Sequence, residues 1–280
     1  MKREDFNKNI KEKMLFESLS GAGKSRTCML ISTIYAMNNK KVLYIDPEKG
    51  TDKDSEKIFG CLTDRELENI EMIHATNIEI YLKYMFGWDE DRSIGPQKTI
   101  IHHGINYDLK VCDGLGTEIE LYKTMLSRKF QDQGYYEIGG KRFDIQNKDT
   151  FVLPYQFYGK LYDQIKEALV IMIDHKYDIL ASIHPLKQTE GQQDLQQHIY
   201  QKFDSVIRLN KHLTPNGYPK WNGTIFKNRG RESPDKSNTL ESIDPIIKYF
   251  ITKFNMDMDE TLERLGMSEK IEEKQSIKVK

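Results

Sequence analysis

Short apolar runs alternate with longer stretches of helical periodicity along most of the chain. Apolar runs bounded by polar residues predict strands at 14–18, 41–45, 70–73, 109–112, 179–183, 205–209 and 224–226. Apolar residues at helical spacing predict helices at 26–37, 74–85, 155–175, 243–254 and 258–265. This alternation favours an α/β fold with a mainly parallel central sheet flanked by helices on both faces. Because the last strands follow one another closely, that edge of the sheet is expected to be antiparallel.

Three stretches do not follow the alternation. Residues 87–106 are charged around an isolated apolar run, KTIIHHG, which fits a hairpin insertion. Residues 127–153 are predicted to be a long loop, of the kind that carries function in a compact domain. Residues 186–202 contain six glutamines and few apolar groups, which favours a mobile binding loop.

The same pattern gives a provisional domain division. Residues 1–13 form a charged N-terminal segment, and residues 14–240 hold the alternating elements. Residues 241–280 comprise a short C-terminal helical appendage and a charged tail that is expected to be poorly ordered.

Composition narrows the class of protein. The 280 residues include 42 Lys and Arg against 43 Asp and Glu, so the net charge of −1 excludes a globally basic nucleic-acid binder. No apolar run reaches the roughly 18 residues needed to cross a bilayer, so no membrane partner is expected. The three scattered cysteines give neither a disulfide framework nor Cys-x-x-Cys metal spacing. A reducing, intracellular and cytoplasmic location is therefore expected, in a cell or encoded by a virus or plasmid.

The most informative segment is Ser18-Leu-Ser-Gly-Ala-Gly-Lys-Ser25, between the first predicted strand and the helix after it. Strand, glycines, Gly-Lys-Ser and helix together predict a phosphate-binding loop. The residues expected to bind ATP are Ser20, Gly21, Ala22, Gly23, Lys24, Ser25 and Arg26. The usual motif begins with Gly where this chain has Ser18, so an ordinary glycine-containing turn is the alternative.

Two acidic residues fit such a loop, because they end strands that are expected to lie beside the phosphate-loop strand. Asp113 follows the strand LKVC and is the candidate to support Mg²⁺ together with the Ser25 hydroxyl. Glu48 follows the strand at 41–45 and is the candidate to orient the attacking water. The alternatives are an Asp-Gly turn at Asp113 and a plain surface carboxylate at Glu48.

Several segments, in order, resemble the RecA/RadA-type P-loop ATPases of the RecA/KaiC superfamily. Besides the phosphate loop and Asp113, these are YIDPEKG at 44–50, the polar end of ILASIHP at 179–185, and FKNRG at 226–230. The resemblance covers about residues 14–235 and is to the compact RecA-like ATPases of phages and archaeal viruses. It implies a RecA-like P-loop NTPase fold that binds ATP and Mg²⁺.

The resemblance also implies roles for further residues. Glu48 would be catalytic, and His184 would sense the γ-phosphate. Lys227 and Arg229 would reach the γ-phosphate held by a neighbouring subunit, which requires self-assembly into a ring or filament. The alternatives are a strand-capping role for His184 and ordinary edge-strand charges at Lys227 and Arg229.

Three functions remain open from the sequence. The first is ATP hydrolysis acting on single-stranded DNA in recombination, annealing or replication. Residues 123–148 favour it, because six basic residues outnumber three acidic ones and alternate with aromatic residues. The second is a KaiC-like signalling or assembly ATPase with a protein partner, and the third is a viral motor that packages or translocates DNA.

Overall fold

The computed structural model describes most of the chain. The described residues are 11–48, 52–86, 107–173, 177–186, 190–213, 219–228 and 239–267. The predicted hairpin insertion at 87–106 and the charged tail lie outside them.

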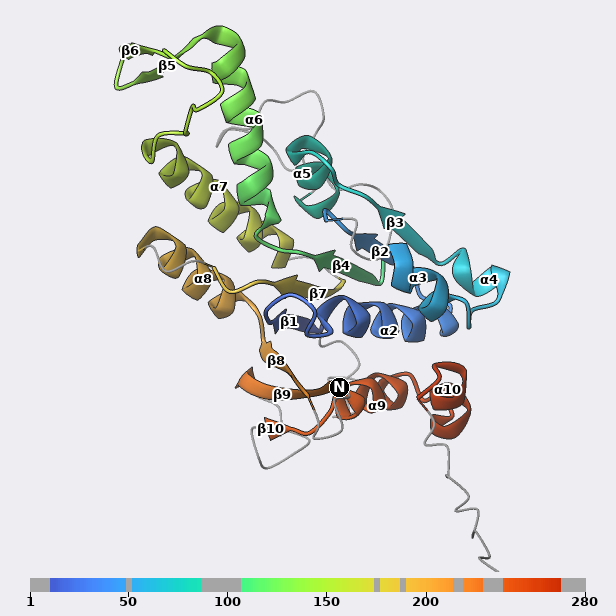
Figure 1. The fold of residues 1–280 in the computed structure, drawn as a ribbon. Helices are drawn as coiled ribbons and strands as arrows, with labels where there is room; N and C mark the ends of the chain where they lie inside the picture. Colours follow the sequence, from blue (N-terminus) through green and yellow to red (C-terminus); the bar gives the residue numbers. More distant parts are fainter. Residues whose placement is uncertain are drawn as a thin grey trace, which may run out of the picture.

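The central feature is an eight-stranded sheet with the order β10-β9-β8-β1-β7-β4-β2-β3 (Figure 1). Its strands are β1 (Lys13–Glu17), β2 (Val42–Ile45), β3 (Ile70–Ile73), β4 (Leu109–Asp113), β7 (Asp178–Ile183), β8 (Ser205–Leu213), β9 (Pro219–Asn228) and β10 (Thr239–Leu240). Six of them, from β8 through β3, run parallel, while β9 and β10 add an antiparallel edge. The predicted α/β class and its antiparallel edge are confirmed.

Helices cover both faces of this sheet. They are α2 (Lys24–Met37), α3 (Asp52–Phe59), α4 (Asp64–Leu67), α5 (Ile78–Phe86), α6 (Thr117–Gln133), α7 (Gln156–Ile173), α8 (Glu190–Lys202), α9 (Asp244–Lys253) and α10 (Met258–Arg264). One apolar core lies between the sheet and α2, α3 and α9, and the other lies between the sheet and α5 to α8. The C-terminal helix α9 is part of the first core, since Ile246, Ile247, Phe250 and Ile251 are buried there.

The strand order corrects one detail of the sequence interpretation. The strands ending in Asp113 and before Glu48 were expected beside the phosphate-loop strand. Instead β7 lies between β1 and β4, and β2 lies beyond β4. Because all four strands are parallel, their carboxyl ends still share one edge of the sheet, where ligands of open α/β sheets bind.

The predicted loop at 127–153 is wrong. Helix α6 runs on to Gln133, and a two-stranded hairpin follows, with β5 (Tyr135–Ile138) paired to β6 (Lys141–Asp144). Together with α7 these elements form an arm that projects from the sheet (Figure 1). Its tip has a small core of its own around Leu126, Phe130 and Leu153.

The predicted mobile loop at 186–202 is wrong as well. Residues 190–202 form α8, which packs against the sheet through Leu195, Ile199 and Phe203, all fully buried. These residues are four apart, so one helix face is apolar while the glutamines lie elsewhere. Within the described part of the chain, no helix has the length and apolarity needed to span a bilayer.

Candidate active site

The loop between β1 and α2 has the backbone of a phosphate cradle. Gly21 and Gly23 have φ angles of 75° and 89°, in the left-handed region that other residues rarely adopt. A Cβ on Gly21 would meet no atom within 4 Å, so the chain needs glycine there for its conformation and not for space. Gly23 then caps α2, whose N-terminal N–H groups and dipole favour an anion.

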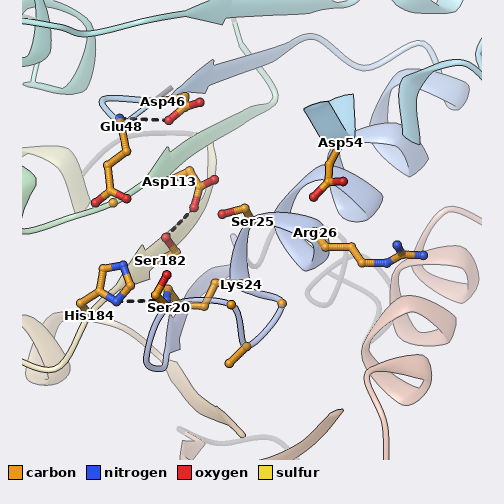
Figure 2. Close-up of a pocket in the computed structure, with 14 residues that line it drawn as sticks. Ser20, Lys24, Ser25, Arg26, Asp46, Glu48, Asp54, Asp113, Ser182 and His184 are labelled. Carbon is orange, nitrogen blue, oxygen red and sulfur yellow. Dashed lines mark hydrogen bonds between the residues drawn. The ribbon is translucent and has the colours of Figure 1, made fainter. Parts of the chain in front are cut away.

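A pocket of about 340 Å³ lies over this loop at the carboxyl edge of the sheet (Figure 2). It is lined by Ser20, Gly21, Ala22, Gly23, Lys24, Ser25, Arg26, Asp46, Glu48, Asp54, Asp113, Gly114, Ser182 and His184. All the residues predicted to bind ATP, the two candidate acids and His184 are therefore in one place.

Lys24 is held by the loop itself. Its Nζ donates to the carbonyl oxygens of Ser18 and Leu19, at 2.8 and 3.2 Å, and to the Ser18 hydroxyl at 3.1 Å. It also lies 3.4 Å from Nδ1 of His184. Burial lowers the pKa of Lys24, while the nearby Asp113 and Glu48 carboxylates act in the opposite direction. The ammonium is thus desolvated and faces acceptors that a phosphate oxygen can replace.

Asp113 is buried with both carboxylate oxygens fixed. The Ser182 hydroxyl donates to Oδ1 at 2.6 Å and the Tyr44 hydroxyl donates to Oδ2 at 2.8 Å. Burial raises the pKa of Asp113, and hydrogen bonds from Ser182, Tyr44 and Ser25 oppose that rise. The Ser25 side chain lies beside this carboxylate in Figure 2, so two hard oxygen donors meet at the first turn of α2. This pair fits Mg²⁺, which takes oxygen ligands and keeps several waters.

Among the described residues, no three His, Cys, Asp or Glu side chains gather in a metal-binding group. A cation at Ser25 and Asp113 would therefore take its other ligands from phosphate and water. That division suits Mg²⁺, which binds through one or two protein groups plus substrate phosphates.

Glu48 lies across the pocket from the loop. Its Oε1 accepts a hydrogen bond of 3.0 Å from the Thr117 hydroxyl, and its main-chain N–H donates to Oδ1 of Asp46 at 3.1 Å. Gly114, with φ of 121°, lets the two strand ends approach: a Cβ there would lie 3.2 Å from Cγ of Pro47 and 3.5 Å from Oε1 of Glu48. Glu48 is therefore placed by the end of its own strand and by the loop between β4 and α6.

Lys227 lies outside the pocket. Its Nζ donates to the carbonyl oxygens of Tyr200, Gln201 and Phe203, at 2.6, 3.1 and 2.6 Å, at the C-terminus of α8. An ammonium has three donors, and these carbonyls accept from all of them. A role across an interface would require these bonds to be exchanged. Arg229 lies outside the described residues, so the roles predicted for both residues stay predictions.

Several residues of the site were missed from the sequence. Tyr44 and Ser182 hold Asp113, Thr117 holds Glu48, and Asp54 lines the pocket. Ser182 lies near the end of β7, two residues before His184, which was a usable signal. Tyr44 gave none, because every residue of β2 is buried and the strand has no polar alternation.

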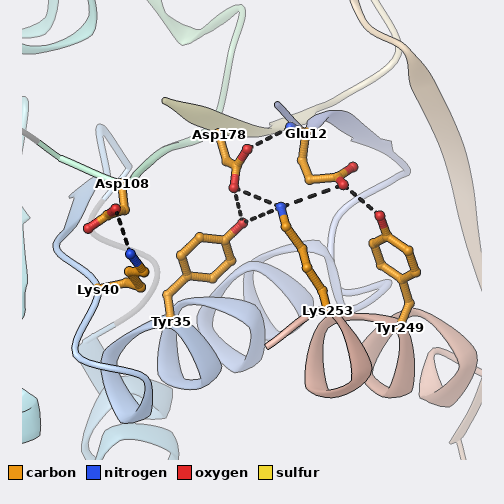
Figure 3. A network of polar contacts seen from close by, with 7 residues as sticks. All are labelled: Glu12, Tyr35, Lys40, Asp108, Asp178, Tyr249 and Lys253. Carbon is orange, nitrogen blue, oxygen red and sulfur yellow. Dashed lines mark hydrogen bonds and ion pairs between the residues drawn. The ribbon is translucent and has the colours of Figure 1, made fainter. Parts of the chain in front are cut away.

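A second polar cluster lies at the far end of α2 (Figure 3). Lys253 of α9 donates to Oδ2 of Asp178 at 2.8 Å and lies 3.5 Å from Oε1 of Glu12. Tyr35, near the end of α2, donates to Asp178 at 2.5 Å, and Tyr249 donates to Glu12 at 2.6 Å. The helix that begins at the phosphate loop is thus joined at its other end to β7, the chain before β1, and α9.

Comparisons with known proteins found similarity among solved structures. No protein-family model matches the chain, and no curated protein matches it. The chain is similar to the flagellar accessory protein FlaH from Methanocaldococcus jannaschii, with a TM-score of 0.45 and 13% identity over 81% of this chain and 86% of that one. It is also similar to the RadB recombinase, with a TM-score of 0.43 and 12% identity over 79% and 83%.

A KaiC-like protein from the hyperthermophilic archaeon Pyrococcus horikoshii gives a TM-score of 0.43 and 14% identity over 79% of this chain and 81% of that chain. At these identities and TM-scores the likeness is one of overall fold. Substrate and partner must therefore be argued from the residues of this chain.

Proposed function

We propose that the chain is a Mg²⁺-dependent ATPase whose active site is the pocket over the phosphate loop. The observation that carries this proposal is the convergence of Lys24, Ser25, Glu48 and Asp113 on one pocket from three segments of the chain. Phosphate-binding loops occur with many reactions. Here a buried carboxylate beside Ser25 and a second carboxylate across the pocket favour hydrolysis over simple nucleotide binding.

Each residue has a distinct task in the proposed reaction. The loop N–H groups and Lys24 bind the β- and γ-phosphate oxygens, and they favour the charge that develops there during transfer. Ser25 and Asp113 would hold Mg²⁺, which supplies charge neutralisation at the phosphates. Glu48 orients a water for in-line attack and accepts its proton. His184, in contact with Lys24, would sense the γ-phosphate.

Assembly is the second part of the proposal. We propose that Arg229 and Lys227 act on the nucleotide of a neighbouring subunit in a ring or filament. Lys227 is not expected to act on the nucleotide of its own chain. Its side chain binds the carbonyls at the end of α8, and it does not line the pocket. Such a cation in trans raises turnover by about 10³–10⁵, so an isolated subunit would be nearly inactive.

For the acted-on partner we propose single-stranded DNA, bound along the arm. Basic and aromatic residues alternate there, and this combination suits a single strand. Some of these groups already have partners, however. Arg142 is ion-paired with Asp144 at 2.9 Å and stacks 3.9 Å from the Tyr135 ring centre, and Lys123 is paired with Glu120.

A protein partner is the second candidate, and exposed apolar groups on the arm favour it. Phe143, Val152 and Tyr155 are 43%, 80% and 64% exposed. Apolar side chains this exposed on one projecting element are typical of protein contacts.

The first experiment measures ATP hydrolysis by the wild type and by Lys24→Ala. We expect the variant to lose turnover while remaining folded, because Lys24 contacts the loop and not the apolar core. If this variant hydrolyses ATP as fast as the wild type, the pocket is not the ATPase active site.

The second experiment adds single-stranded DNA at increasing salt. We expect DNA to raise turnover and to bind less tightly to the double variant Lys141→Ala/Arg142→Ala, with the salt slope reduced by about 0.7 for each lost phosphate contact. If single-stranded DNA neither binds the protein nor changes its ATP turnover at any salt concentration, the protein partner is favoured.

A further inference from the structure

Glu118 is a buried carboxyl for which the proposed reaction has no use. It stands in the first turn of α6, and the residue is fully buried. Its Oε2 accepts a hydrogen bond from the Gly116 N–H, while its Oε1 is buried without a hydrogen-bond partner. A carboxylate with one bare oxygen in an apolar core is costly, whereas an uncharged acid there costs much less.

A chain of side chains connects Glu118 to the strand that ends in Asp113. The Tyr81 hydroxyl of α5 interacts with the Glu118 carboxyl and lies 3.0 Å from Sγ of Cys112. Tyr81 and Cys112 are fully buried too. Tyr81 therefore joins β4 to the first turn of α6, inside the core and away from the nucleotide.

The first turn of α6 is also where the site and the arm meet. Thr117, next to Glu118, donates its hydroxyl hydrogen to Glu48. Two glycines with positive φ, Gly114 and Gly116, precede it, so the loop between β4 and α6 has few steric restraints of its own. The position of Thr117 thus depends on what anchors the helix start, where Glu118 is buried in the core together with Leu115 and Ile119.

We infer that Glu118 is a positioning residue that works as an uncharged acid, fixing the first turn of α6 so that Thr117 holds Glu48 over the pocket. This inference rests on the proposed ATPase function. Glu118 touches neither nucleotide nor water in this scheme and acts through Thr117 alone. Ionisation would place an unpaired charge in the core, shift the start of α6 and release Glu48.

The Glu118 carboxyl changes its charge state near neutral pH. Burial raises the pKa of Glu118 to about 7, against main-chain hydrogen bonds from residues 118 and 116 and the Tyr81 hydroxyl, which lower it. The ionisable groups that face it are Tyr81 from α5 and Cys112 from β4. Burial raises the pKa of both well above their ordinary values, so they stay neutral while Glu118 titrates.

The test compares wild type, Glu118→Gln and the control Glu120→Gln between pH 5.5 and 8.5. Glu120 lies on the exposed face of the same helix. A group that titrates near pH 7 should make wild-type kcat fall about tenfold from pH 6 to pH 8. Glu118→Gln should keep kcat within about twofold of wild type at pH 6 and lack that fall, with KM for ATP unchanged. Glu120→Gln should behave as wild type.

A stability measurement separates this inference from the ATPase proposal. The pKa of Glu118 rises from 4.5 to about 7 on folding, so the folded state holds this proton more tightly than the unfolded state does. The resulting stabilisation is complete below pH 4.5 and is lost as the pH rises to 7. The unfolding free energy of wild type, relative to Glu118→Gln, should therefore decline between these values and level off above. Parallel curves would overturn the inference whether or not the chain hydrolyses ATP. Active enzymes with identical pH profiles would overturn it too, whereas absent turnover would overturn the ATPase proposal.

Should Glu118→Gln fail to fold, Tyr81→Phe carries the same test. Loss of the Tyr81 hydroxyl removes a hydrogen bond that lowers the pKa of Glu118. The decline in kcat should then move to higher pH. A decline that stays in place, or moves to lower pH, contradicts the inference.

Discussion

Ser18 shows how one substitution in a motif is accommodated. The position is usually glycine, yet here the serine hydroxyl accepts a hydrogen bond from Lys24 and the serine carbonyl accepts another. The same hydroxyl donates to the Leu19 carbonyl at 2.9 Å. Ser18 therefore adds an acceptor for the ammonium while Gly21 and Gly23 provide the left-handed turns that the loop needs. The departure from the motif is thus compatible with a phosphate loop.

Glu48→Gln tests the proposed base. The amide can still accept from the Thr117 hydroxyl and orient a water, but it is a poor proton acceptor. We expect kcat to fall by about 10²–10⁴ with ATP binding retained. Asp113→Asn is the matched control, because it should weaken the Mg²⁺ dependence instead. A fully active Glu48→Gln beside an inactive Asp46→Asn would transfer the role to Asp46.

At the scale of elements, strands were easier to predict than the helices α6 and α8. The buried strands stand out as short apolar runs, and most of their predicted bounds agree with the structure to within a few residues. Helix α8 was missed because its glutamines outweighed Leu195, Ile199 and Phe203 in composition, although their spacing was helical. In the arm, α7 was predicted at 155–175, but α6 and the hairpin were missed, because their core around Phe130 forms between segments distant in sequence, which no local pattern reveals.

The candidate site was predictable where motif and strand end coincide, at Lys24, Ser25 and Asp113. The support of Asp113 by Tyr44 was not, because it depends on which strands lie side by side. The partner of Lys227 was equally hidden, since sequence cannot tell that a helix ends beside that strand.

Several contacts hold helix α8 in place, and Lys227 makes one of them. Gln196, in its middle, donates to Oε1 of Glu17 at 3.2 Å, and Lys227 binds the carbonyls at its end. Lys227→Met should lower the free energy of unfolding by about 1–3 kcal/mol, measured by urea denaturation, because helix-end carbonyls lose a charged donor. Lys211→Met, at an exposed position on β8, is the control and should change little.

A different result for Lys227→Met would support the cross-subunit role. In that result, the unfolding curve of Lys227→Met matches that of the wild type, while ATP turnover by the concentrated variant is largely lost. Lys227 would then act on the nucleotide of a neighbouring subunit, and its bonds to α8 would not be needed for stability.

At the scale of the whole molecule, the proposed assembly predicts complementation. Lys24→Ala and Arg229→Ala should each be nearly inactive, and mixing them should restore part of the turnover. In a mixed assembly, the intact loop of an Arg229→Ala subunit meets the intact arginine of a Lys24→Ala subunit. Light scattering should first establish that the variants assemble together. Co-assembly without recovery, and wild-type turnover independent of concentration, would rule out the trans role.

The cluster around Lys253 has a consequence for the order in which the chain is made. Its carboxylates, Glu12 and Asp178, belong to segments beside strands in the middle of the sheet, and their cation comes 75 residues after Asp178. At about 5–20 residues per second, a ribosome needs roughly 4–15 s to cover that distance. During this time the strands exist, but two carboxylates that the finished fold buries have no counter-ion. These two carboxylates therefore gain their cation only when α9 is made, so a helix near the C-terminal end of the chain completes a cluster that begins just before the first strand.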